Sequence, residues 1–312
     1  MNILVYGAGV LGSYLAHGLV RGGHNVTMLA RGQRLNELQN DGSVIRHYFQ
    51  FRTTVDKVNV IRELRPEDVY DLIFVVMKYP DFQTVLPALA ANHSSHVVIV
   101  GNNASPHEMR DYLEANSPVA KKVAFGFLVG AGWRETGRMI SVHGPKGQMI
   151  IGGLGEELVW RSMIDQAFVN SKFKLTYYKD MDEWLKSHFI MVLPMNFIAN
   201  AYDGNLRQAV KDSKLLNHVI DAIDEGNQVL EKLGYTVTPE SQKEWVRQKR
   251  KLLYMGLKMM LGTPVGRTLL SDKAVSENEI SALTQAFHDL KQSANMSTPN
   301  WDMLINYSPA SK

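Results

Sequence analysis

The feature that most constrains the fold of this chain is the hexapeptide GAGVLG at residues 7–12. It directly follows NILVY, an apolar run at 2–6 that is typical of a buried strand. It also opens a segment, residues 10–21, in which apolar side chains recur with helical spacing. A glycine-rich turn between a strand and a helix is the first part of a dinucleotide-binding βαβ unit.

Each glycine of this turn has a separate physical role. Gly7 permits the tight turn, Gly9 lets a pyrophosphate approach the backbone, and Gly12 lets the helix pack against the strand. The backbone N–H groups at the start of the helix then face the phosphates. The alternative is a glycine-rich turn that binds no ligand. We expect a cofactor site here and assign to it Gly7, Ala8, Gly9, Val10, Leu11 and Gly12.

The remainder of the first half alternates short apolar runs with helical patterns. This alternation predicts a Rossmann-type, doubly wound parallel sheet. A hairpin of residues 139–143 and 148–152, joined by GPKG, is expected to close the domain, followed by a helix at 156–170. The predicted strands are 2–6, 25–30, 71–77, 96–100, 123–129 and 173–178, with helices at 10–21, 33–40 and 81–91.

Beyond Lys179 the strand-like runs largely disappear and long helical patterns replace them. One of these patterns stops at Gly234, a residue suited to end a helix. The sequence therefore predicts an α/β fold in two parts: an NADP-binding domain at 1–178 and an all-helical substrate and dimerisation domain at 179–312. The predicted helices of the second part are 180–201, 212–233, 239–261 and 276–294.

The end of the second strand indicates which dinucleotide is bound. NAD sites usually place an acidic residue there to bind the ribose 2′-hydroxyl, but this chain has Ala30 and Arg31. A guanidinium can bind a 2′-phosphate through charge-assisted hydrogen bonds, and Arg34 is a second candidate for this contact. The alternative for Arg31 is an ordinary surface arginine. We expect NADP(H) as the cofactor.

Composition excludes several classes of protein. The chain has no cysteine, so disulfides and thiolate chemistry are excluded, and no metal site is expected from the spacing of its histidines. The net charge of +3 is too small to indicate a nucleic-acid partner, and the basic run RQKRK at 247–251 is interpreted as a solvated helix face. No run is apolar enough to span a membrane, and the N-terminus lacks a basic signal segment. We expect a cytoplasmic protein.

A lysine stands at the head of the apolar segment WLKSHFIMVLPMN at 184–196. With helical spacing, Lys186 shares a face with Phe189, Ile190 and Leu193. Such a lysine either pairs with Asp182 or Glu183 and extends its ammonium group to solvent, or has a chemical role, and the periodicity leaves both interpretations open.

Several segments together resemble one family. GAGVLGS, LARGQRL, VVMKYPDF and the GNN at 101–103 are similar, in this order, to segments of the ketopantoate reductase (2-dehydropantoate 2-reductase) family. The resemblance implies that Lys78 and Asn102 lie beside the cofactor and substrate. It also implies that Lys186 is the general acid, and that the enzyme reduces a 2-oxo acid with NADPH.

The substrate-holding positions depart from the family pattern. Where the family has asparagines one and two turns after the lysine, this chain has Ile190 and Pro194. Asn196 and Asn200 lie nearby, and a late family glutamate corresponds to Glu279, with Glu277 as a competitor. The serine-rich substrate segment of the family has no clear counterpart in GTPVGRTLLSD.

The resemblance therefore leaves three functions open. The first is reduction of ketopantoate, the second is reduction of another branched or aromatic 2-oxo acid, and the third is NADP sensing without turnover. The expected small-molecule partner is a 2-oxo acid. We also expect a homodimer formed through the helical domain.

Overall fold

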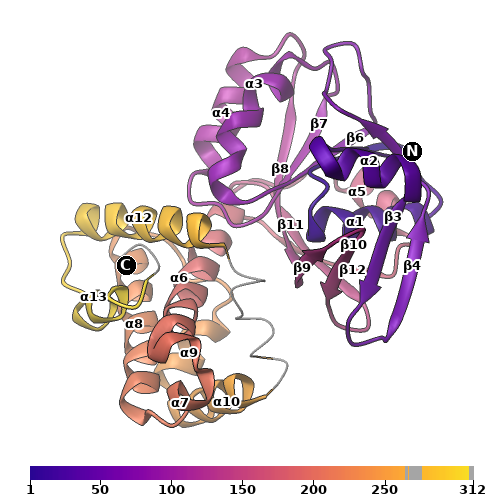
Figure 1. Ribbon diagram of the computed structural model, residues 1–312. Helices are drawn as coiled ribbons and strands as arrows, with labels where there is room; N and C mark the ends of the chain where they lie inside the picture. Colours follow the sequence, from indigo (N-terminus) through magenta and orange to yellow (C-terminus); the bar gives the residue numbers. More distant parts are fainter. Residues whose placement is uncertain (264–265, 267–275, 309–312) are drawn as a thin grey trace. The chain divides into compact units, whose positions relative to one another are not determined.

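The computed structural model describes residues 1–263, 266 and 276–308, apart from the side chains of 200, 203 and 204. The chain divides into two compact units, Met1–Met181 and Asp182–Lys312 (Figure 1). The first unit combines sheets and helices, and the described part of the second is helical. The predicted fold class, a Rossmann-type sheet domain followed by a helical region, is confirmed.

An eight-stranded sheet forms the centre of the first unit. Its neighbouring described strands are parallel except for the pair β8 and β11. The six strands from β5 to β8 have the strand order of a dinucleotide-binding fold, because the chain moves outward from β1 in both directions. In spatial order the strands are β12 (Phe173–Tyr178), β11 (Gly147–Gly152), β8 (Lys122–Val129), β7 (His96–Val100), β6 (Leu72–Val76), β1 (Asn2–Tyr6), β2 (Asn25–Leu29) and β5 (Asn59–Ile61).

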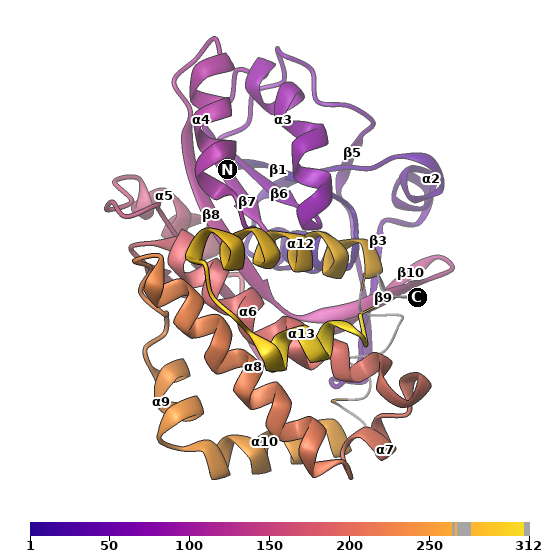
Figure 2. The same ribbon diagram turned by 90° about the vertical axis from the view of Figure 1, so that its left-hand side faces the viewer.

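Helices cover both faces of this sheet, which is why its strands are nearly continuous apolar runs. Helices α3 (Phe82–Ala91) and α4 (Pro106–Asn116) lie side by side on one face (Figures 1 and 2). Helices α1 (Val10–Arg21) and α5 (Arg161–Phe168) pack on the other face, where Leu15, Phe74 and Ile164 are fully buried. Helix α2 (Gly32–Asp41) follows β2.

The predicted hairpin of 139–143 and 148–152 is wrong. Its first strand, β10, pairs with β9 and β3 in a separate four-stranded sheet. Its second strand, β11, pairs with β8 and β12 in the large sheet. Two neighbouring apolar runs do not reveal whether they pair with each other or with distant strands. The small sheet has the order β4 (Arg52–Asp56), β3 (Ser43–His47), β10 (Arg138–Val142) and β9 (Ala131–Glu135).

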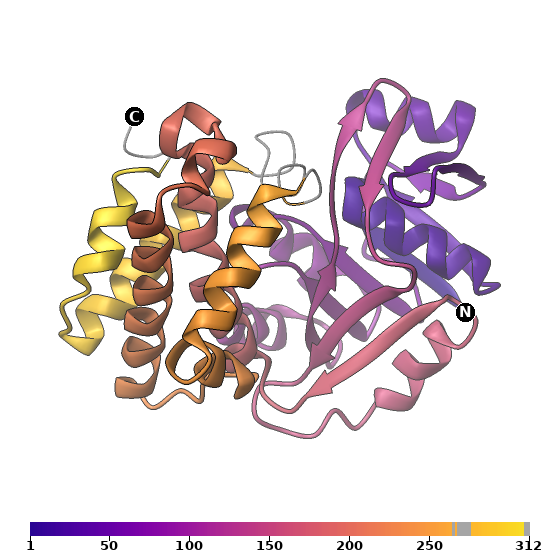
Figure 3. The same cartoon turned by 90° about the horizontal axis from the view of Figure 1, so that it is seen from below.

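Helix α8 (Ser213–Lys232) is the centre of the second unit, and most of the other described helices of that unit contact it. Its course between its neighbours can be followed in Figures 2 and 3. Gly234 ends this helix as predicted, since its φ is +87° and the N–H of Tyr235 returns to Leu230 O at 3.0 Å. The predicted helix at 239–261 is broken into two. The other described α-helices are α6 (Met181–Asn200), α7 (Leu206–Ala209), α9 (Ser241–Arg247), α10 (Arg250–Gly262), α12 (Glu277–Ala294) and α13 (Pro299–Ile305).

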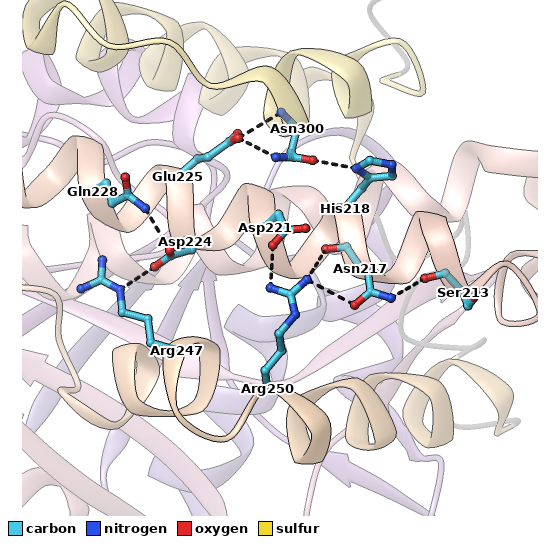
Figure 4. A network of polar contacts seen from close by, with 10 residues as sticks. All are labelled: Ser213, Asn217, His218, Asp221, Asp224, Glu225, Gln228, Arg247, Arg250 and Asn300. Atoms are coloured by element: carbon cyan, nitrogen blue, oxygen red, sulfur yellow. Dashed lines mark hydrogen bonds and ion pairs between the residues drawn. The ribbon is translucent and has the colours of Figure 1, made fainter.

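Polar contacts attach three of these helices to α8 (Figure 4). Arg247 donates to Asp224 at 2.6 Å, and Arg250 donates to Asp221 at 2.5 Å. The carboxylate of Glu225 accepts from the side-chain and backbone N–H groups of Asn300, at the start of α13. The basic run RQKRK therefore contributes two arginines to ion pairs within the helical unit.

Candidate active site

The glycine turn follows β1, the strand from which the strand order of the large sheet runs outward in both directions. Gly7 has φ +121°, and a Cβ atom there would lie 2.2 Å from the carbonyl oxygen of Val76. The turn after β1 is thus pressed against the carboxyl end of β6, which only glycine permits. In open α/β sheets ligands bind at this point, beside the carboxyl ends of the two diverging strands.

The other two glycines differ sharply in what surrounds them. A Cβ on Gly12 would lie 1.8 Å from Gly7 O, so this glycine lets α1 approach the turn. A Cβ on Gly9 would meet no heavy atom within 4 Å. Gly9 is also the N-cap of α1, whose first turn has no acidic residue and no side-chain cap. The turn therefore offers open space and N–H donors to a pyrophosphate, and its geometry fits a dinucleotide.

Arg34 is buried against the protein side of this turn and hydrogen-bonds to it. This position differs from the one expected for a second ligand of the 2′-phosphate. It is 5% exposed, and it donates to Ala8 O at 3.2 Å and to Ser13 Oγ at 3.1 Å. Its charge is balanced by Glu37, which also accepts from Arg134 at 2.9 Å. Burial lowers the pKa of Arg34, and the contact with Glu37 opposes that shift. A guanidinium at the carbonyl of Ala8 fixes the shape of the cofactor turn.

Arg31 is exposed and is the N-cap of α2. It lines a pocket of about 600 Å³ together with Gly32, Leu35, Asn36, Arg62 and Glu63. Since Arg31 follows β2, this pocket begins where a dinucleotide fold binds the adenosine ribose.

Lys78 and Asn102 follow neighbouring strands at the same edge of the sheet as the glycine turn. Lys78 comes two residues after β6 and is exposed, while Asn102 comes two residues after β7 and is half-buried. Their backbones approach closely, because a Cβ on Gly101 would lie 2.5 Å from Met77 O. The first unit thus places the glycine turn, Lys78 and Asn102 at one edge of the sheet, and the cofactor contacts that the resemblance implies for Lys78 and Asn102 stay a prediction.

Lys186 is buried in the second unit, with 5% of its surface exposed. Its Nζ is ion-paired with Asp182, one turn earlier on α6, and lies 4.9 Å from the ring centroid of Tyr235. Asp182 is also buried, at 3%. The apolar face that follows Lys186 on α6 is shielded from solvent, since Phe189, Ile190 and Leu193 are each at most 1% exposed. The ammonium group therefore does not extend along this stripe to bulk solvent, and the aromatic ring adds a favourable contact.

The predicted substrate residues occupy different places on α6 and α12. Asn196 donates its side-chain amide to Val192 O at 3.0 Å, within its own helix. It lies ten residues beyond Lys186, which is about 15 Å along a helix axis. Glu279 is half-buried in the first turn of α12, beside exposed Glu277. The side chain of Asn200 and most of GTPVGRTLLSD lie outside the described residues.

Sequence reasoning missed a buried histidine cluster in the first unit. His47 Nδ1 lies 2.8 Å from His143 Nε2, and the rings of His17 and His47 are 4.9 Å apart. His17 in turn contacts Asp56 at 2.6 Å. No local spacing connects these residues, because they come from α1, β3, β4 and the end of β10.

Among the described residues, no group of three or more His, Asp or Glu side chains is placed to hold a metal ion.

Comparison with known proteins gives the chain a family. Residues 3–156 match the family described as ketopantoate reductase PanE/ApbA. Over these residues the chain belongs to the ketopantoate reductase family. The resemblance read from GAGVLGS, LARGQRL and the later segments is thereby confirmed. Among curated proteins, none matches the chain.

Several solved structures are similar to this chain in fold over nearly its whole length. The 2-dehydropantoate 2-reductase from Methylococcus capsulatus aligns with a TM-score of 0.73 at 14% identity, covering 100% of this chain and 96% of that one. A PanE/ApbA family ketopantoate reductase from Ralstonia eutropha JMP134 gives 0.74 at 18%, covering 97% and 96%. D-mandelate dehydrogenase with NADH and anilino(oxo)acetate gives 0.75 at 18%, covering 99% and 98%. At these identities the likeness concerns the fold.

In the described part of the chain, no helix meets the length and hydropathy needed to cross a membrane.

Proposed function

We propose that this ketopantoate reductase family member is an NADPH-dependent reductase of a 2-oxo acid. The observation that carries the proposal is the turn at 7–12. A Cβ on Gly7 or Gly12 would clash with a backbone oxygen, whereas the space beside Gly9 is empty of protein atoms within 4 Å. No contact within the protein explains a glycine at position 9, which is the N-cap of α1. A ligand that approaches the backbone at this helix N-terminus would explain it.

The residues around Arg31 favour NADP(H) over NAD(H). The position after β2 has no carboxylate to accept a ribose 2′-hydroxyl, and the exposed guanidinium of Arg31 lines a pocket instead. An arginine there can bind a 2′-phosphate through two hydrogen bonds that are strengthened by charge. The solved D-mandelate dehydrogenase binds NADH, so the proposed preference for NADPH rests on the residues around Arg31 in this chain.

The chemistry requires a hydride and a proton. When bound, NADPH supplies the hydride to the carbonyl carbon of the oxo acid. Negative charge then develops on the carbonyl oxygen, which must be stabilised and protonated. Lys186 is proposed as the acid, because its ammonium group can do both. Asn102 is proposed to donate a hydrogen bond beside the cofactor, and Lys78 to contact the cofactor from the neighbouring strand end.

The substrate class follows from the family, whereas the individual substrate does not. The relatives include 2-dehydropantoate 2-reductases and a D-mandelate dehydrogenase that holds anilino(oxo)acetate, an oxo acid with an aromatic ring. Glu279, Asn196 and Asn200 remain candidates for substrate contacts. The second candidate function, NADP sensing without turnover, is favoured by one observation: Ile190, at a position where the resemblance expects a substrate-facing asparagine, is fully buried.

A single assay separates these functions. NADPH oxidation is followed at 340 nm with a panel of 2-oxo acids that includes ketopantoate, 2-oxoisovalerate and phenylglyoxylate, and again with NADH. We expect turnover with at least one oxo acid and a preference for NADPH. Arg31→Ala should weaken NADPH binding by about 2 kcal/mol and leave NADH nearly unchanged. Tight NADPH binding without oxidation of NADPH by any oxo acid would favour the sensor.

A further inference from the structure

The pocket beside Arg31 contains a second arginine, which comes from the neighbouring strand. Arg62 immediately follows β5, and β5 pairs in parallel with β2. The N–H of Ala30 donates to Ile61 O at 3.0 Å, directly before the two arginines in the chain. This backbone bond fixes Arg31 and Arg62 at adjacent carboxyl ends of the sheet, and both line the same pocket.

The electrostatics of this pocket favour an anion. Within the described residues, neither Arg31 nor Arg62 has a protein carboxylate in salt-bridge distance. Glu63, the one acidic residue that lines the pocket, is directed to Arg65, whose Nε lies 3.5 Å from its carboxylate. Two positive side chains thus remain for a ligand, and Leu35, which is 5% exposed, provides an apolar wall between them and the core.

We propose that Arg62 and Arg31 together bind the 2′-phosphate of NADP(H), so that Arg62 is a residue that determines cofactor specificity. This inference rests on the proposed function. A phosphate monoester carries close to two negative charges at neutral pH, and one guanidinium neutralises only half of that charge. A second guanidinium, at the end of the adjacent parallel strand, completes the neutralisation and gives the phosphate a second set of hydrogen-bond donors. NADH has no group at this position, so its binding gains nothing from Arg62.

An arginine beside an adenosine can also stack on the adenine ring. That contact would serve NADPH and NADH equally, because both carry the same base. The two roles therefore differ in selectivity, which binding measurements can detect without any turnover.

The experiment measures dissociation constants by calorimetry for NADPH, NADH, adenosine 2′,5′-bisphosphate and 5′-AMP. The variants are Arg62→Ala, Arg31→Ala and Glu63→Gln. Lys57→Ala is the matched control, because it removes a positive charge before the amino end of β5, away from the pocket. Thermal melting of each variant establishes that the fold is retained.

We expect Arg62→Ala to weaken NADPH and the bisphosphate by about tenfold and to change NADH and 5′-AMP by less than twofold. Glu63→Gln should strengthen NADPH slightly, and Lys57→Ala should change nothing. Equal losses for NADPH and NADH would overturn the inference in favour of stacking. A loss in Arg31→Ala alone would also overturn it, while leaving the proposed NADPH preference intact. If the unmodified protein binds NADPH and NADH equally, the proposed cofactor preference itself is wrong.

Discussion

His47 Nδ1 lies 2.8 Å from His143 Nε2 in the buried interface between α1 and the small sheet. The protons in this contact can be assigned. His143 Nδ1 lies 2.7 Å from the carbonyl oxygen of Gly144, which only accepts, so Nδ1 carries the proton and Nε2 is an acceptor. His47 must then donate from Nδ1, and its Nε2 accepts from Thr54 Oγ at 2.8 Å. His143 Nδ1 also lies 3.1 Å from the hydroxyl oxygen of Tyr14, which then accepts from it. With these assignments both rings are neutral and each of the contacts has one donor and one acceptor.

This network predicts a loss of stability in mild acid. Burial, followed by the charges of His17 and His143, lowers the pKa of His47 from 6.5 to about 4, with Arg52 acting in the same direction and Asp56 opposing it. Burial also lowers the pKa of His143. Between the lowered pKa of each histidine and 6.5, the unfolded chain therefore binds protons at His47 and His143 that the folded protein does not bind. The stabilisation is fully present above pH 6.5 and is lost as the pH falls toward 4, by about 3 kcal/mol for His47.

The check is urea unfolding at pH 7.5, 6, 5 and 4.5. His47→Asn keeps a donor near the Nδ1 position but cannot titrate, so its stability should be lower at pH 7.5 and less dependent on pH below 6.5. The exposed His93 gives the control His93→Asn, which should retain the acid dependence. An unchanged acid dependence in His47→Asn would contradict the prediction.

Two glycines of the cofactor turn should respond oppositely to the same added methyl group. Gly12→Ala places a Cβ 1.8 Å from Gly7 O and should destabilise the apoprotein by about 2 kcal/mol or more. Gly9→Ala meets nothing and should leave the melting temperature nearly unchanged. It should nevertheless weaken cofactor binding by about tenfold or more, because the methyl group occupies the pyrophosphate approach. Normal NADPH affinity in Gly9→Ala would show that the open space is not the cofactor site.

The buried ion pair of Lys186 complicates any simple test of its catalytic role. Lys186→Met should destabilise the protein by about 3–5 kcal/mol, because it removes the ammonium group that is ion-paired with the buried carboxylate of Asp182. The double variant Lys186→Met/Asp182→Asn removes both charges and should recover much of that loss. Both variants should lower the turnover number by about 10² or more, the scale expected for loss of a general acid. Urea unfolding and NADPH oxidation measure the two effects separately. Turnover close to normal in the folded double variant would make Lys186 a structural residue.

Local sequence signals predicted the parts of the molecule that depend on local geometry. The runs at 2–6, 25–30 and 96–100 are buried on both faces, so their apolar composition was sufficient. The roles of Gly7 and Gly12 followed from the spacing of GAGVLG, since close packing at a strand–turn–helix needs glycine at these positions. Gly234 likewise marked a helix end.

Features that depend on distant partners were not predictable. The strand at 43–47 pairs with β10, almost a hundred residues later, and its sequence SVIRH has little apolar character. Arg34 is only a second candidate for the 2′-phosphate contact in the sequence, because it is close to Arg31 along the chain. One turn of helix directs it instead to Ala8 O and Glu37, contacts that only the folded turn creates. Lys186 was placed on a buried face correctly, but its partner Tyr235 comes from the segment after α8.

The last prediction concerns the substrate. Ketopantoate carries a hydroxyl group that 2-oxoisovalerate lacks, and an enzyme selective for it needs a polar partner for that hydroxyl. The resemblance places an asparagine at position 190, but Ile190 is fully buried there, and its Cγ2 lies 2.5 Å from where a Cβ of Gly226 would be. This side chain packs α6 against α8 and offers no hydrogen bond. Asn196 donates to its own helix at Val192 O.

Losing the partner of a substrate hydroxyl can cost several kcal/mol of discrimination. We therefore expect kcat/KM for ketopantoate to be no better than that for 2-oxoisovalerate, and lower than that for the best oxo acid in the panel. Ile190→Asn is not a suitable test, since it would place an amide in the core beside Gly226. Comparing the two substrates with the unmodified protein is decisive. If ketopantoate is preferred by a hundredfold, about 2.7 kcal/mol, the pocket retains a hydroxyl partner, and Thr263, Asn196 and Glu279 are the first residues to replace.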